Sequence, residues 1–151
     1  MKTEVLGVDL SSLKNLNKTV DKEFIMADAI GEFSLKHTGT TYAKTGDEIS
    51  SYVSWEGSAT DFGTVFGTLR FPTSMAEGGA TSGSCSWVGQ SFLEDGTTLL
   101  VVGEGDFEQV NGQNQWLVNM HMDNSNGDQM HSKGKIDLQS RTFQGELFEG
   151  K

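Results

Sequence analysis

Apolar and polar residues alternate over residues 31–149 with the period of two that is typical of β-strands. The alternation predicts strands near 31–41, 49–57 and 63–71, and five more between 86 and 148. A run of eight antiparallel strands must close on itself to protect its edges. The pattern therefore predicts an all-β fold, an eight-stranded antiparallel up-and-down barrel.

Turn signals between the predicted strands give their pairing. The signals are Ala59-Thr60-Asp61, Asp95-Gly96, Asn111-Gly112, Ser125-Asn126-Gly127 and Gln139-Ser140. We expect three-residue loops at the first and fourth and two-residue turns at the others. The resulting cross-strand pairs include Trp55 with Val65, Gln90 with Val101, Phe107 with Trp116, Met120 with Ser132 and Ile136 with Phe143. With these registers the apolar residues and several glycines share one face, and Trp87, Glu104, Asn119 and Lys133 lie on the other.

The shared face is expected to line the barrel. Its apolar members are Phe33, Leu35, Val53, Trp55, Val65, Leu69, Phe71, Val88, Phe92, Leu99, Val101, Phe107, Trp116, Val118, Met120, Met122, Met130, Ile136, Phe143 and Leu147. The polar ones are few: His37, Ser51, Gln90 and Ser132. A barrel of this size is either filled by its own side chains or holds one small ligand, and the sequence leaves both alternatives open.

Residues 1–30 precede the predicted barrel domain, residues 31–149. They contain Leu6, Leu10, Leu13, Val20 and Phe24 near helical spacing, which predicts a short helix or a disordered segment. Residues 72–84 are rich in glycine and lack periodicity, so they are expected to form a loop at the rim of the barrel.

Charge and cysteine content narrow the function classes. The formal net charge of −10, from 11 basic and 21 acidic residues, argues against a nucleic-acid or anionic-membrane surface. The single cysteine, Cys85, leaves no internal disulfide and fits a reducing compartment. The first residues lack the apolar stretch of a signal peptide, and no run approaches the roughly 20 apolar residues of a membrane span. A cytoplasmic location is expected.

Eight strands, glycines within them, an aromatic interior and the segment Gly103-Glu104-Gly105-Asp106-Phe107 before the Asn111-Gly112 turn resemble the allene oxide cyclase-like, calycin-like barrels. That grouping includes plant fatty-acid cyclases and bacterial proteins. The resemblance implies a barrel, an apolar ligand space and an oligomer. No catalytic residue of the cyclases aligns with this chain, so the resemblance implies no activity. Lipocalins are similar at this level, but their Gly-x-Trp signature near the first strand is missing.

Candidate site residues follow from the predicted interior. His37 and Gln90 are the catalytic candidates, because they are among the few inward groups that can exchange a proton or a hydrogen bond. The ligand-binding candidates are Trp55, Phe71, Phe107, Trp116, Met120 and Ser132. For His37 the competing interpretation is a structural histidine bonded to a neighbouring hydroxyl or amide.

No metal site or cofactor is expected. His121 and His131 are predicted to lie opposite each other on the outer face, and they lack a third ligand. The sequence also contains no P-loop, no complete dinucleotide loop and no nucleophile elbow.

Three functions remain open. The first is a protein that binds a small apolar molecule in the lumen, the second a cyclase or isomerase acting on such a molecule, and the third a filled barrel serving as a structural module. A homo-oligomer is expected because one cross-strand row on the outer face is more apolar than a solvated surface usually is. This row consists of Gly89, Val102, His121, His131 and Phe148.

Overall fold

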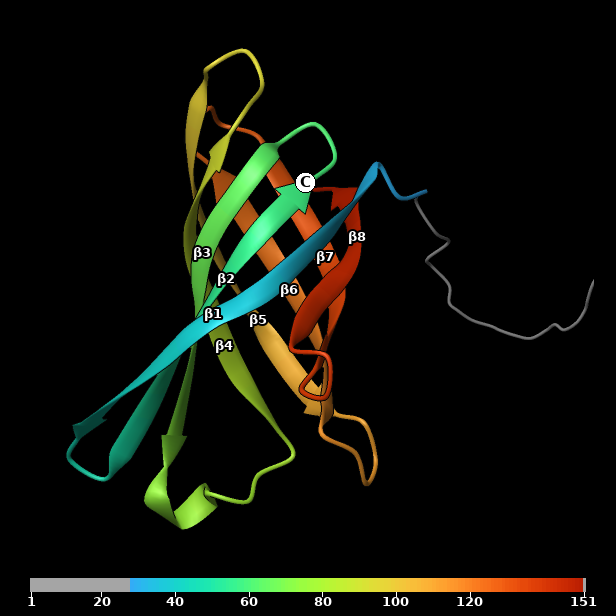
Figure 1. Cartoon of the computed structure of the whole chain (residues 1–151). Helices are drawn as coiled ribbons and strands as arrows, with labels where there is room; N and C mark the ends of the chain where they lie inside the picture. The colour runs from blue at the N-terminus through green and yellow to red at the C-terminus, as the bar shows by residue number, and fades with distance from the viewer. Residues whose placement is uncertain (1–27, 151) are drawn as a thin grey trace, which may run out of the picture.

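The computed structural model of the protein describes residues 28–150. The elements are β1 (Gly31–Thr45), β2 (Glu48–Ala59), β3 (Gly63–Ser74), the 3-10 helix η1 (Met75–Glu77), β4 (Ser82–Phe92), β5 (Thr98–Gln109), β6 (Gln115–Asn124), β7 (Gln129–Asp137) and β8 (Thr142–Glu149). Each strand pairs antiparallel with the next, and β1 pairs with β8 to close the barrel (Figure 1). The predicted eight-stranded barrel is confirmed, whereas the helix predicted between Leu6 and Phe24 lies outside the described residues.

Two hairpins have the predicted register. In β6–β7, Met120 pairs with Ser132 across a loop in which Gly127 has a φ of 96°. In β7–β8, Ile136 pairs with Phe143. The β6–β7 loop is the expected type I turn followed by a left-handed glycine, because the Gly127 N–H donates to the Asn124 carbonyl oxygen at 2.9 Å.

Two other hairpins differ from the prediction by two residues. Phe107 pairs with Val118 and not with Trp116, and Trp55 pairs with Gly67 and not with Val65. The β5–β6 turn is longer than two residues, because the Val110 N–H donates to the Gln115 carbonyl oxygen at 2.8 Å. A shift of two leaves every side chain on its predicted face.

The β4–β5 hairpin differs by one residue, and this turns β4 over. Its loop is Glu94-Asp95-Gly96, closed by a bond of 2.8 Å from the Leu93 N–H to the Thr97 carbonyl oxygen. Gly89 therefore pairs with Val101, which places Trp87 inside and leaves Gln90 exposed on the outer face. The predicted inward positions of Gln90, Val88 and Phe92 are wrong, and so is the outward position of Trp87.

The interior is divided by a layer of packed side chains. Trp55, Leu69, Val118, Ile136 and Phe143 are all buried, and the Trp55 and Phe143 ring centroids lie 5.6 Å apart. We call these five residues the septum. The β2–β3, β4–β5 and β6–β7 loops lie on one side of the septum, at the end that we call the closed end because its cavity is small, and η1 and the β1–β2 hairpin project on the other side, at the open end (Figure 1).

The outer face is mostly polar along β6–β8, where the predicted outward positions of Asn119 and Lys133 are confirmed. The predicted outer row is wrong at Gly89 and Val102. Val102 pairs with Val88, while Glu104 joins His121 in the row that continues to His131 and Phe148. Among residues 28–150, no helix is long and apolar enough to cross a membrane.

Candidate functional site

Two cavities lie within the described part of the barrel, one on each side of the septum. The cavity at the closed end has a volume of about 60 Å³, and the one at the open end about 660 Å³. No residue lines both. Because specific ligand pockets usually measure some hundreds of Å³, the open-end cavity is the candidate site and the closed-end cavity has room for no more than a few waters.

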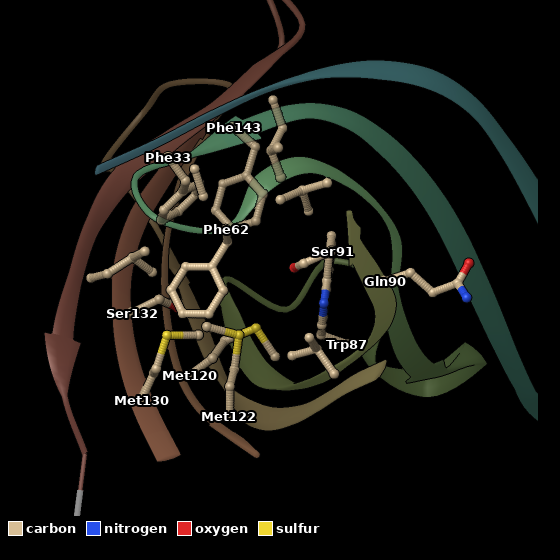
Figure 2. A pocket seen from close by; sticks show the side chains of 15 residues that line it. Phe33, Phe62, Trp87, Gln90, Ser91, Met120, Met122, Met130, Ser132 and Phe143 are labelled. Carbon is tan, nitrogen blue, oxygen red and sulfur yellow. The ribbon is translucent and has the colours of Figure 1, made fainter. Parts of the chain in front are cut away.

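Two predicted ligand-binding residues, Met120 and Ser132, line the small closed-end cavity (Figure 2). They lie on the far side of the septum from the large cavity. Gln90 also borders the closed-end cavity, but it is exposed and its amide points away from the interior in Figure 2, so Gln90 does not share a cavity with His37. Phe62, in the β2–β3 loop, also lines this end, which the sequence analysis missed because a three-residue loop carries no alternation.

The other predicted ligand-binding residues come together in the open-end cavity. Its wall consists of His37, Thr40, Tyr42, Ser51, Val53, Trp55, Phe71, Phe107, Trp116, Ile136, Leu138 and Arg141. Trp55, Phe71, Phe107 and Trp116 were all predicted as ligand contacts. The Phe71 and Phe107 rings meet edge to face, with centroids 5.3 Å apart, so the wall presents both a ring face and a ring edge.

His37 lines the same cavity beside a hydroxyl group that the sequence analysis did not select. Its Nε2 atom lies 2.7 Å from Thr40 Oγ1. The register between β1 and β2 shifts at Thr38, since His37 pairs with Trp55 while Gly39 pairs with Ser54. This irregularity changes which residues of β1 point inward, and it brings Thr40 to the same side as His37.

Trp55 forms the floor of the large cavity as well as part of the septum. Its side chain is 2% exposed, and its ring meets that of His37 at a centroid distance of 5.7 Å. The indole N–H is buried and has no hydrogen-bond partner among the described residues. An unpaired buried donor costs roughly 1–3 kcal/mol of folding free energy.

The mouth of the cavity is the exposed edge of its wall, where Tyr42, Leu138 and Arg141 lie, next to the point at which β1 and β8 separate. Their pairing ends at Lys36 and Thr142, and one further bond, 3.0 Å long, joins the His37 N–H to the Arg141 carbonyl oxygen. Arg141 has a left-handed φ of 58° in the β7–β8 turn, and it is an exposed residue that borders the cavity. No pattern in the sequence pointed to Arg141, because it follows a polar turn that is typical of an exposed loop.

Other reactive side chains lie outside this cavity. His121 and His131 pair on the outer face as predicted, and residues 28–150 contain no cluster of three potential metal ligands. Burial and then the charge of Lys133 lower the pKa of His131 from its usual value. Burial and the Asp106 charge raise the pKa of the Cys85 thiol to about 11, so it is a poor nucleophile at neutral pH.

Comparisons of this chain with protein-family models, with curated proteins and with solved structures found no match.

Proposed function

We propose that the protein binds one small, mainly apolar molecule in the open-end cavity. The observation that carries this proposal is the combination of a volume of about 660 Å³ with a wall in which Trp55, Phe71, Phe107 and Trp116 converge. Pockets of this size and composition hold drug-sized molecules, and burial of apolar surface supplies most of the affinity. The septum supports the proposal, because it fills the core separately and leaves the cavity free for a guest.

The test is a titration with a neutral aromatic probe, N-phenylnaphthylamine, followed by calorimetry and by native mass spectrometry. Val53→Trp adds an indole ring to the cavity wall and should abolish binding. Tyr52→Trp is the matched control, because Tyr52 lies one position away on β2 and faces the other side of the sheet. Unchanged binding by the Val53→Trp variant, or no binding by the unaltered protein, would refute the proposal.

A second candidate function is a cyclase or isomerase that acts on the bound molecule. The His37–Thr40 hydrogen bond favours it, because an imidazole held by a hydroxyl group in an apolar cavity can exchange a proton with a guest. His37→Gln should then abolish turnover of a bound substrate and leave its affinity nearly unchanged. Equal loss of binding and turnover would instead assign His37 a positioning role. We propose the resemblance to allene oxide cyclase-like barrels together with this second candidate function.

We also propose a homo-oligomer and a cytoplasmic location. The oligomer is supported by a revised outer patch, in which Val88 and Val102 pair and Leu100 and Phe66 lie in the next row, all of them exposed. Exposed apolar patches often mark subunit contacts. Leu100→Glu should shift light scattering toward the monomer mass, whereas a wild-type monomer would discard this interface.

A further inference from the structure

The large cavity has a charge character that the molecule as a whole does not share. The full chain carries a formal charge of −10, yet no Asp or Glu lies among the residues that line this cavity. Its ionisable wall residues are His37, Tyr42 and Arg141. An apolar cavity with a cation at its mouth and no carboxylate in its wall favours a guest with a negative group at one end.

Arg141 is available for such a group. Within residues 28–150 the other arginine, Arg70, pairs with Glu48 at 3.3 Å and lies outside the large cavity, whereas Arg141 makes no ion pair. The backbone of Arg141 is held against β1 by the hydrogen bond from His37, which fixes the start of its side chain at the mouth. A guanidinium presents paired N–H donors that match the two oxygens of a carboxylate.

The rest of the wall indicates the shape of the guest. Half of the twelve lining residues carry an aromatic ring, and they surround the cavity from β1, β2, β3, β5 and β6. Flat rings gain from stacked and edge-to-face contacts with such a wall, while a flexible chain loses more rotational freedom on binding.

We propose that the ligand is an aromatic carboxylate, whose ring lies between the Phe71–Phe107 pair and Trp116 and whose carboxylate meets Arg141 at the mouth. This inference rests on the proposed function and adds the chemical class of the ligand. Further hydrogen-bonding groups of the cavity wall on β1 are the Tyr42 hydroxyl and the pair formed by Thr40 Oγ1 and His37 Nε2, which lie 2.7 Å apart.

The experiment compares three probes by calorimetry: naphthoic acid, its neutral analogue naphthalenemethanol, and the aliphatic decanoic acid. We expect naphthoic acid to bind about threefold to fivefold more tightly than the alcohol, the range for a partly exposed ion pair. Decanoic acid should bind more weakly than naphthoic acid. Arg141→Asn should remove the preference for the acid over the alcohol, and asparagine tolerates the left-handed backbone at this position.

Lys135→Gln is the matched control. Lys135 lies exposed on the outer face of β7, and its loss changes the net charge by the same amount as Arg141→Asn. The Lys135→Gln variant should keep the acid preference. Equal affinity for acid and alcohol, equal effects of the two substitutions, or tighter binding of decanoic acid would each overturn the inference. If N-phenylnaphthylamine binds while naphthoic acid shows no advantage, this inference fails alone, and if neither binds, the proposed function fails with it.

Discussion

The Trp87 ring of β4 lies against Gly67 of β3, and this contact allows a quantitative test of the interior. Trp87 is 6% exposed, and a β-carbon added at Gly67 would lie 2.6 Å from Trp87 Cε2 and still nearer to Cζ2. Gly67→Ala therefore has to displace a buried indole ring. Overpacking of this kind costs about 1–3 kcal/mol of unfolding free energy, and Trp87→Ala costs about 3–5 kcal/mol through the cavity it leaves.

The double variant separates the clash from any other effect of the alanine. With Trp87 replaced by alanine, the added methyl group at Gly67 meets empty space, and alanine in a strand is favoured over glycine by roughly 0.5–1 kcal/mol. We expect the two substitutions to couple by about 2 kcal/mol in urea unfolding followed by circular dichroism. Should Trp87→Ala fail to fold, Trp87→Leu serves the same comparison.

Additive effects would refute this packing. The sequence-derived register, in which Trp87 lies on the solvent face, predicts additivity and a small cost for Trp87→Ala. The cycle therefore tests the placement of β4 directly.

Two further predictions concern titration. Burial, then Lys133 and His121, lower the pKa of His131 from 6.5. On acidification the unfolded chain therefore takes up this proton at a higher pH than the folded protein does, and the unfolding free energy falls as the pH drops below 6.5. His131→Gln should lose less stability than the wild type between about pH 7.5 and about pH 5.5 in urea titrations, and identical losses would contradict the assignment. Because burial and Asp106 raise the pKa of Cys85 from 9.0 to about 11, the folded protein near neutral pH should react with Ellman's reagent about tenfold more slowly than the unfolded chain. Its contribution to stability should be lost as the pH rises above 9.0, and equal reaction rates for folded and unfolded protein would show that the thiol is not shielded.

The sequence predicted the closure of the barrel and the faces of most strands, because each strand alternates strongly enough to fix which side is apolar. It did not predict loop lengths. Asp95-Gly96 and Asn126-Gly127 form the same structure, in which the Asp or Asn side chain accepts from the N–H two residues later at 2.9 Å. Reading one as a two-residue turn and the other as part of a three-residue loop placed β4 on the wrong face.

The composition of β4 explains why its own pattern did not correct the error. The segment Ser86-Trp87-Val88-Gly89-Gln90-Ser91-Phe92 has an apolar side chain on either face, so both registers bury some of them. A three-residue loop with Asp95 as the acceptor for the Thr97 N–H places Trp87 inside and Gln90 outside. For the candidate site, aromatic residues were predictable from alternation. Thr40 and Arg141 were not predictable. Thr40 reaches the cavity wall because of the irregularity at Thr38, and Arg141 reaches it because β1 and β8 separate there.

The septum between the two cavities bears on how this protein can change over evolutionary time. Substitutions such as those at Val53 or Phe107 alter a wall that already faces open space, and the packed layer of Trp55 and Phe143 lies between that wall and the closed end. New ligand preferences can therefore arise at the open end with little loss of folding free energy. Proteins that descend from this barrel can change their ligands while the residues of the closed end stay nearly constant. The sequences of homologues should therefore vary most at the wall of the open-end cavity.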